Sequence, residues 1–274
     1  MKKTGIVISC VLLLFVLAFA GTVSAYNADY THTNYLSDVK PTADGTYIVD
    51  DEWIASGTQT FGTNGMFNDE WCMPEGVWAC LLIETEDGTD DAEDQWVICY
   101  DSTDEGGETE PDGGTAPQTN DYKLVITGHG TGATVEWYKG TGTDWALATT
   151  PPDSTVFEYG QSLTTTPRIE ADHYVLELCI EKQDTTMGTV IMGYNWAQFV
   201  SYYDADTGET QQWPPAPASA DVPDSWGYIV YEFAANPEPS IPETTGFVVM
   251  LALSSVAATA AVLLRKRTKI ANLN

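Results

Sequence analysis

The stretch His173-Tyr-Val-Leu-Glu-Leu-Cys-Ile-Glu181 has the composition of a β-strand, and similar stretches recur over residues 26–235. Short runs of this kind recur between clusters of Gly, Thr and Asp, and no long run follows the period of an amphipathic helix. The pattern predicts an all-β domain folded as one antiparallel β-sandwich. The predicted strands are residues 45–49, 77–84, 96–100, 122–127, 134–139, 154–159, 173–181, 188–204 and 226–233.

The N-terminus has the three-part layout of a secretory signal peptide. Lys2 and Lys3 precede an apolar run over residues 6–20, and the small-residue tripeptide Val23-Ser24-Ala25 follows. The sequence therefore predicts cleavage after Ala25, which removes residues 1–25. An uncleaved N-terminal anchor is the alternative, and the shortness of the apolar run disfavours it.

The C-terminal part has the layout of a membrane anchor. Residues 236–244 are proline-rich, which predicts a stiff spacer, and residues 245–264 are uncharged and long enough for a transmembrane helix. Arg265-Lys266-Arg267 then opens a basic tail over residues 265–274. Because basic residues stay on the cytoplasmic side, we expect a single-pass type I protein with residues 26–235 outside the cell.

Acidic residues are concentrated in the predicted extracellular part. Residues 26–244 contain all 40 acidic residues and five basic ones, a net charge of −35. Such a surface repels nucleic acid and anionic polymers and favours cations. The alternative is a general solvation device, as in proteins adapted to high salt.

Removal of the signal peptide leaves four cysteines, Cys72, Cys80, Cys99 and Cys179. An even number outside the membrane indicates two disulfides, and several connectivities are open. The pairing we favour joins Cys72 to Cys80 across a short loop and Cys99 to Cys179 between two strands. Metal binding by cysteines is the weaker alternative, because no Cys-x-x-Cys pair occurs.

All nine tryptophans of the chain lie in the predicted extracellular domain. Sugar rings stack on indole faces through their C–H groups, so tryptophan with nearby acids and amides suits carbohydrate binding. Trp145, Trp213 and Trp226 sit among Gly, Pro, Thr and Asp, and we expect them as exposed ligand-binding platforms. Core packing is the alternative role of tryptophan, and we expect it at strand-like positions, namely Trp53, Trp78 and Trp96.

Two acidic loops are candidates for calcium binding, because calcium takes six to eight oxygen ligands. The runs are residues 86–94 and 101–112, and neither matches the spaced calcium-loop signature. We expect at most one ordered ion, with solvated surface loops as the alternative for most of these acids. The candidate ligands are Asp87, Asp90, Asp94, Asp101 and Asp104.

Enzymatic activity is not expected. The chain has three histidines, no Gly-x-Ser-x-Gly or His-Glu-x-x-His motif, and no phosphate-binding loop before a helix. Paired carboxylates for glycoside cleavage cannot be singled out in a domain so rich in acids.

Four segments together resemble family-9 carbohydrate-binding modules and the related DOMON-like domains. They are Asp44-Gly-Thr-Tyr-Ile-Val-Asp-Asp-Glu-Trp53, Glu93-Asp-Gln-Trp-Val-Ile-Cys-Tyr-Asp101, Asn120-Asp-Tyr-Lys-Leu-Val-Ile126 and the stretch 173–181. The resemblance covers residues 40–235 and implies a jelly-roll-like β-sandwich, with a later-strand glutamate packed near the first segment. It also implies sugar binding or, as in DOMON relatives, haem binding, for which Met66, Met73, Met187, Met192, His129, His173 and Lys123 are possible ligand types.

The C-terminus is similar to PEF-CTERM or PEP-CTERM sorting tails, with Pro237-Glu238-Pro239 and Pro242-Glu243-Thr244 as candidate motifs before the helix and the basic cluster. That resemblance implies a sortase-like processing enzyme as a partner. The leading hypothesis is a membrane-anchored surface module that binds carbohydrate, such as an extracellular polysaccharide. The alternatives are a structural envelope protein with cation-binding acidic loops and a haem-binding electron-transfer domain.

Overall fold

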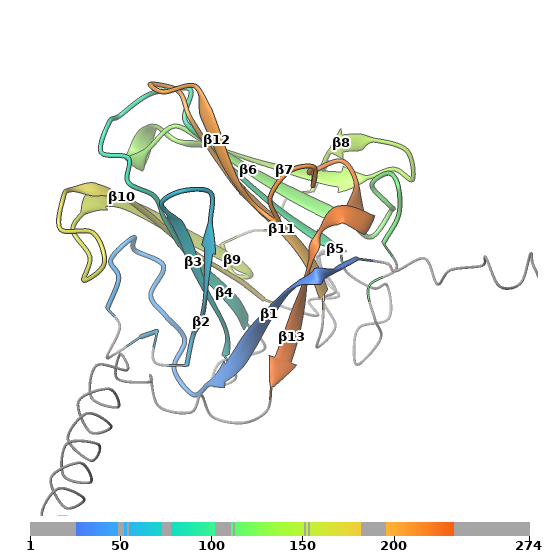
Figure 1. Cartoon of the computed structure of the whole chain (residues 1–274), viewed down its shortest axis with the longest axis horizontal. Helices are drawn as coiled ribbons and strands as arrows, with labels where there is room; N and C mark the ends of the chain where they lie inside the picture. The colour runs from blue at the N-terminus through green and yellow to red at the C-terminus, as the bar shows by residue number, and fades with distance from the viewer. Residues whose placement is uncertain are drawn as a thin grey trace, which may run out of the picture. The chain divides into compact units, whose positions relative to one another are not determined.

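A computed structural model describes residues 26–48, 52–53, 55–72, 78–101, 111, 113–150, 152, 154–181 and 196–232 (Figure 1). All of them belong to one compact unit, residues 1–235. The predicted signal peptide, spacer, transmembrane segment and basic tail lie outside the described residues. No helix in the described part is long and apolar enough to cross a membrane.

The described chain is built from strands and short turns, which confirms the all-β class. Its strands are β1 (Asn27–Ser37), β2 (Gly57–Phe61), β3 (Gly65–Cys72), β4 (Trp78–Glu84), β5 (Gln95–Asp101), β6 (Tyr122–Thr127), β7 (Thr134–Gly140), β8 (Trp145–Leu147), β9 (Phe157–Thr164), β10 (His173–Glu181), β11 (Trp196–Asp204), β12 (Glu209–Trp213) and β13 (Gly227–Glu232). Two single-turn 3-10 helices, η1 (Gly130–Gly132) and η2 (Pro223–Ser225), are the helical elements of this part.

All described strands belong to one curled sheet, with the order β8-β7-β6-β5-β11-β13-β1-β3-β4-β10-β9 and with β12 and β2 paired to β11 and β3. Most neighbours are antiparallel, but β1 runs parallel to both β13 and β3, so the sheet is mixed where a purely antiparallel one was predicted (Figure 1). The sheet curls so that side chains from both halves meet in one core. That core contains Leu81 and Leu178 from one half and Ile98 and Leu124 from the other.

Alternation along the strands explains which side chains enter the core. In β6, Tyr122, Leu124 and Ile126 are buried while the intervening residues are half-buried, which is the period of a strand with one covered face. Strand β4 is buried along its whole length because both of its faces are covered. Its outer face packs under the segment before β2, where Trp53 and Tyr47 join a second apolar cluster.

A buried carboxylate fixes that covering segment. Glu177 in β10 accepts hydrogen bonds from the backbone N–H groups of Asp44 (3.1 Å), Gly45 (2.9 Å) and Thr46 (3.2 Å). Its other oxygen accepts the indole N–H of Trp53 at 2.7 Å. Glu177, on a later strand, thus contacts both ends of residues 44–53, namely Asp44-Gly45 at one end and Trp53 at the other. Gly45 has a φ of +82°, and a Cβ there would lie 2.4 Å from a backbone nitrogen of β9, so only glycine fits this close approach.

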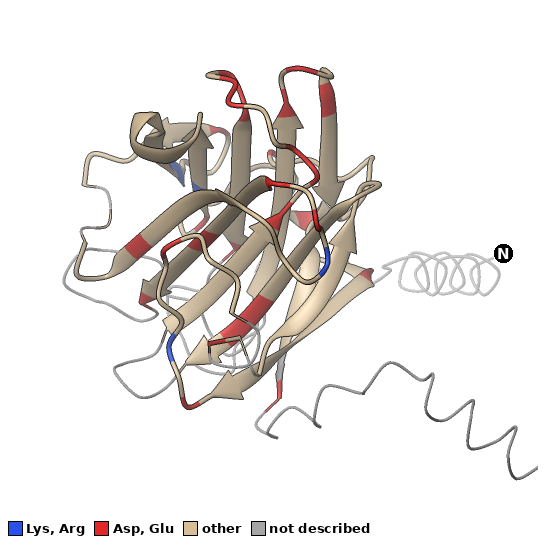
Figure 2. Cartoon of the chain, turned by 90° about the vertical axis from the view of Figure 1, so that its left-hand side faces the viewer, with Lys and Arg blue, Asp and Glu red and all other residues tan. Residues whose placement is uncertain are grey.

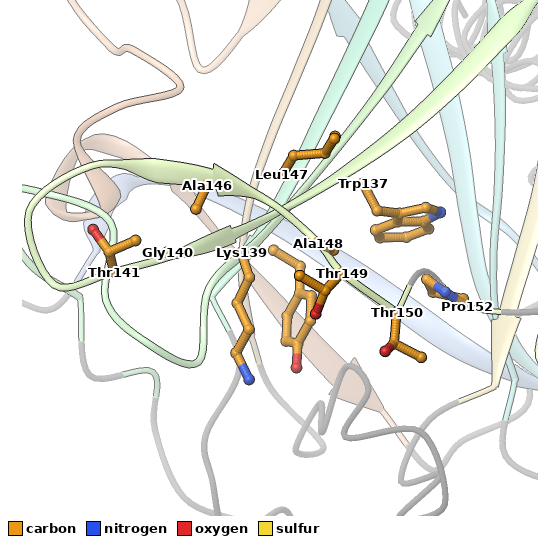
Figure 3. Close-up of a pocket in the computed structure, with 11 residues that line it drawn as sticks. Trp137, Lys139, Gly140, Thr141, Ala146, Leu147, Ala148, Thr149, Thr150 and Pro152 are labelled. Carbon is orange, nitrogen blue, oxygen red and sulfur yellow. The ribbon is translucent and has the colours of Figure 1, made fainter.

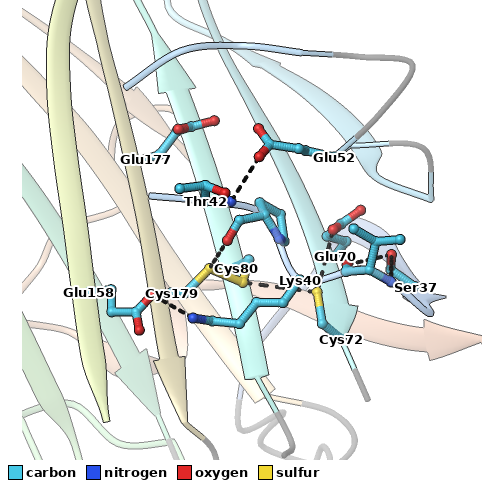
Figure 4. Close-up of a disulfide and its surroundings, with 12 residues drawn as sticks. Ser37, Lys40, Thr42, Glu52, Glu70, Cys72, Cys80, Glu158, Glu177 and Cys179 are labelled. Carbon is cyan, nitrogen blue, oxygen red and sulfur yellow. Dashed lines mark hydrogen bonds and ion pairs between the residues drawn. A yellow bond between two sulfur atoms is a disulfide. The ribbon is translucent and has the colours of Figure 1, made fainter. Parts of the chain in front are cut away.

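The disulfide differs from the predicted pairing. Cys80 and Cys179 lie directly opposite in the antiparallel pair β4–β10 and are bonded, with S–S 2.07 Å (Figure 4). Cys72 and Cys99 are buried free thiols, so the Cys72–Cys80 and Cys99–Cys179 bonds are not formed. Cys72 comes close, because its Sγ lies 4.0 Å from that of Cys80, but strand pairing places Cys179 nearer.

Strand prediction succeeded where apolar residues follow one another and failed where they do not. β6 and β10 match their predicted bounds, and β4, β5 and β7 match within a residue. Residues 45–48 are not a strand, because they belong to the segment held by Glu177. β1, β2, β3, β8 and β12 were missed. Polar residues interrupt the apolar pattern of β1, β2, β3 and β12, and β8 has only three residues.

Candidate ligand-binding groove and buried polar clusters

The two ends of the curled sheet meet at a groove. β7 and β8 form one side and β9 the other, and the Trp137 ring of β7 meets the Phe157 ring of β9 edge to face at 5.1 Å. A hollow of about 440 Å³ lies on the β7–β8 side (Figure 3). A second hollow of about 480 Å³ lies toward β9, and the two share Trp137 and Pro152. Both volumes fall in the range of ligand pockets in proteins.

Trp137 forms the floor common to both hollows. It lies opposite Leu124 in the β6–β7 pair and is 3% exposed. Its indole N–H has no hydrogen-bond acceptor among the described residues. Phe157 and Tyr159, with rings stacked at 5.8 Å, extend the aromatic lining along β9.

Polar side chains surround the aromatic floor. Lys139 is exposed, and its ammonium lies 5.3 Å from the centre of the Tyr122 ring. Thr149 and Thr150 add exposed hydroxyls on the first hollow, on the same side of the β7–β8 hairpin as Lys139 (Figure 3). Among the described residues, Glu158 is the carboxylate that lines the second hollow, and it forms an ion pair with Lys40.

The predicted tryptophan platforms are not part of this groove. Trp213 and Trp226 are 2% and 0% exposed, so the prediction that they are exposed is wrong. Trp213 packs against Phe67 in the main core, and Trp226 packs in a third cluster on the outer faces of β5 and β11. Trp145 is half-buried on that outer side, with its indole N–H bonded to Asp221 at 3.0 Å.

Sequence reasoning did not select Trp137, which is the groove's main aromatic residue. The available signal was the period of two that places Val135, Trp137 and Lys139 on one face of β7. The contact with β9, which creates the groove, joins segments that no local pattern relates.

The predicted calcium ligands separate into different places. Asp87 and Asp94 come together with His129, with one ligand atom of each within 4.8 Å of the others. Asp90 is exposed. Asp101 lies at the opposite end of β5 from Asp94, roughly 20 Å along the strand, and accepts the N–H of Gly113. These two acids therefore cannot share an ion, and Asp104 lies outside the described residues.

The Asp87, Asp94 and His129 group is a hydrogen-bonded network at one end of the core. Asp94 bonds His129 Nε2 at 2.8 Å and accepts the N–H of Ala205 at 2.8 Å. Asp87 accepts the hydroxyl of Tyr202 and both the N–H and the hydroxyl of Thr89. Burial raises the pKa of the Asp94 carboxyl above its usual value.

The donor set of this network fits calcium poorly. Two carboxylates and an imidazole are fewer oxygens than calcium requires, and imidazole suits zinc or related ions better. His129 Nδ1 is also engaged, by Gln161 Oε1 at 3.1 Å, and its ring stacks on Tyr174 at 3.6 Å.

A second buried charge cluster lies on the outer face of β4. Glu84 is fully buried and pairs with Arg168, which also donates to the backbone oxygen of Asn64 at 2.8 Å. Burial by itself raises the pKa of Glu84, but His173 and Arg168 outweigh it and hold the pKa below its usual value. Burial by itself lowers the pKa of His173. The Glu84 carboxylate, 3.9 Å away, outweighs burial and raises the pKa of His173 above its usual value.

In comparisons with known proteins, no family model matches the chain, and no curated protein shows significant similarity to it.

Proposed function

We propose that the chain is a non-catalytic, surface-anchored binding module of jelly-roll type whose groove around Trp137 takes a carbohydrate. The observation that carries the proposal is a buried indole N–H, without an acceptor in the described part of the chain, at the junction of two aromatic-lined hollows. A buried donor left unsatisfied costs about 1–3 kcal/mol, so an oxygen that reaches it gains a hydrogen bond at little cost.

The composition of the groove favours a sugar over a purely apolar ligand. Trp137, Phe157 and Tyr159 offer aromatic surface to C–H groups, while Lys139 and the threonine hydroxyls can bond ring substituents. A sugar presents both kinds of surface at once. The anchor, which rests on residues 245–264, would keep this groove at the cell surface, and a sortase-like enzyme acting on the tail is part of the same proposal.

The test is a panel of oligosaccharides measured by thermal shift and tryptophan emission. The full chain is held in a detergent without a sugar headgroup, because glycosidic detergents would compete. We expect at least one sugar to raise the melting temperature and change the emission. If no sugar in the panel does either, carbohydrate binding is rejected.

A matched pair of variants locates the site. Trp137→Phe keeps the ring but removes the N–H donor, and we expect it to weaken sugar binding by about fivefold. Trp96→Phe is the control, because Trp96 is also a core tryptophan whose N–H has no acceptor among described residues, but it lines neither hollow. Equal losses in both variants would place the sugar elsewhere.

A cation-binding envelope component is the second candidate, and the Asp87, Asp94 and His129 group is the observation that favours it. Calcium and zinc titrations separate the possibilities. A melting temperature raised by zinc and not by calcium would support a metal at this group, and it should be lost in His129→Gln. A rise with calcium alone would point to other acids of residues 86–94 or 101–112.

A further inference from the structure

Basic side chains are scarce in the described part of the chain, and almost all of them have carboxylate partners. Figure 2 shows the few basic segments among many acidic ones. Of the four described, Lys40 pairs with Glu158, Lys123 approaches Asp221 at 4.0 Å, and Arg168 pairs with Glu84. Lys139 is the fourth, and it has no ion pair with any described residue.

This cation lines the first hollow of the groove. It is exposed, and its ammonium contacts the ring of Tyr122. No described carboxylate pairs with this cation, although acids outnumber bases eightfold over residues 26–244. With respect to the described residues, its ammonium is therefore available to an anion that enters the groove.

The described lining of the groove contains one basic residue, Lys139, and one acidic residue, Glu158. Lys40, which is not part of the lining, compensates Glu158 by an ion pair. Lys139 is therefore the uncompensated charge among the described lining residues. A single carboxylate on a ligand would meet an ammonium here, whereas a polyanion would meet the repulsion of the whole surface.

We propose that the groove prefers a sugar that carries one carboxylate, a uronic acid unit in an otherwise neutral oligosaccharide, with its carboxylate paired to the ammonium of Lys139. This inference rests on the proposed carbohydrate-binding function. An exposed ion pair contributes modestly, so the preference over the neutral sugar should be about fivefold. A chain composed only of uronic acids should bind more weakly at low salt, and added salt should reduce its disadvantage.

The test uses matched trisaccharides of glucose, galactose or mannose, each either neutral or with one unit oxidised at C6 to the uronic acid. Dissociation constants for the full chain are measured by calorimetry, for the natural protein, Lys139→Gln and Lys139→Arg. We expect tighter binding of the uronic form in at least one pair, loss of that preference in Lys139→Gln, and its retention in Lys139→Arg.

The possible failures are distinguishable. Equal affinity for neutral and uronic forms, or a preference that survives in Lys139→Gln, overturns the inference and leaves carbohydrate binding intact. Absence of binding by both members of every pair overturns the inference and the proposed function together. Because Lys139 is exposed and outside every described ion pair, we expect its substitution to leave the fold unchanged.

Discussion

Replacing Glu70 by Gln should abolish a large pH dependence of stability. Glu70 lies in β3 on the face covered by the segment before β2, and it is fully buried. Burial, together with the neighbouring acids Asp69 and Glu52, raises the pKa of its carboxyl from 4.5 to about 8. Figure 4 shows Glu70 beside Cys72. The thiol of Cys72 donates to it at 3.4 Å, which opposes the rise only in part.

The folded protein therefore retains a proton that the unfolded chain has already released. Between about pH 4.5 and pH 8, the folded state binds more protons at this site, so the free energy of unfolding falls as the pH rises. The stabilisation is complete below pH 4.5 and is lost as the pH passes the folded-state pKa. Each pH unit inside the window costs about 1.4 kcal/mol, or about 4–5 kcal/mol over the whole window.

Other buried groups titrate nearby, so the difference between two proteins is the quantity to measure. Burial raises the pKa of Glu177 to about 7 and lowers that of His32 to about 4, and these contributions have opposite signs. Both are common to the natural protein and Glu70→Gln. Urea denaturation followed by tryptophan emission at pH 5, 6, 7 and 8 gives the difference in unfolding free energy at each pH.

We expect the unfolding free energy of Glu70→Gln relative to the natural protein to increase by about 1.4 kcal/mol per pH unit between pH 5 and pH 7. Glu209→Gln, which removes an exposed carboxylate from β12, is the control for loss of one negative charge. A difference that stays constant across this range would show that Glu70 is already ionised in the folded protein, and the reasoning from its burial would be refuted.

Three further predictions concern the covalent and polar links of the fold. Cys179→Ser removes the bond to Cys80, which closes a separation of 99 residues, and should lower the unfolding free energy by about 4–5 kcal/mol in urea; a change under about 1 kcal/mol would contradict the pairing. Glu177→Ala leaves four N–H donors without their acceptor and should cost at least about 3 kcal/mol by the same assay, whereas a neutral result would show that water replaces it. Arg168→Met leaves Glu84 buried without its ion-pair partner and should lower the unfolding free energy by roughly 2–3 kcal/mol. Adding Glu84→Met to the same protein should restore most of this loss. No restoration would mean that Arg168 acts through other contacts.

The strands that the sequence predicts well are those whose inner and outer faces are both recognisable by local composition. In residues 122–127 and 173–181, every side chain that faces the main core is apolar or aromatic. β3 fails this test because Asn68-Asp69-Glu70 stands in its middle, yet all three are buried. Their burial depends on partners far along the chain, such as Asn34, which donates to Asp69 at 3.2 Å. A local pattern contains no information about such partners.

The tryptophans predicted to bind a ligand, Trp145, Trp213 and Trp226, show the same limit for the site. Gly and Pro around a residue indicate an irregular backbone, but they do not determine which way the side chain points. The segment after β12 packs onto the outer faces of β5 and β11, and it places Trp226 inside that contact. Trp137, in a regular strand, instead lines a groove because the two ends of the sheet meet there. The prediction of the disulfide pairing is wrong for a similar reason. Strands β4 and β10 place Cys80 opposite Cys179, a residue far away in the sequence.

The acidic residues have two physical roles, solvation of the surface and acceptance of hydrogen bonds inside the protein. Amino-acid composition alone does not distinguish them. A net charge of −35 over residues 26–244 invites the view that the acids serve to solvate the surface. Eight described acidic residues are instead buried, namely Asp69, Glu70, Glu84, Asp87, Asp94, Asp101, Asp121 and Glu177. Several accept backbone N–H groups of segments that have no strand partner, as Glu177 does for residues 44–46. Since carboxylates accept hydrogen bonds without donating any, they can satisfy the donors of irregular segments packed over a sheet. Salt should therefore change the contribution of the exposed acids and leave that of the buried ones largely intact.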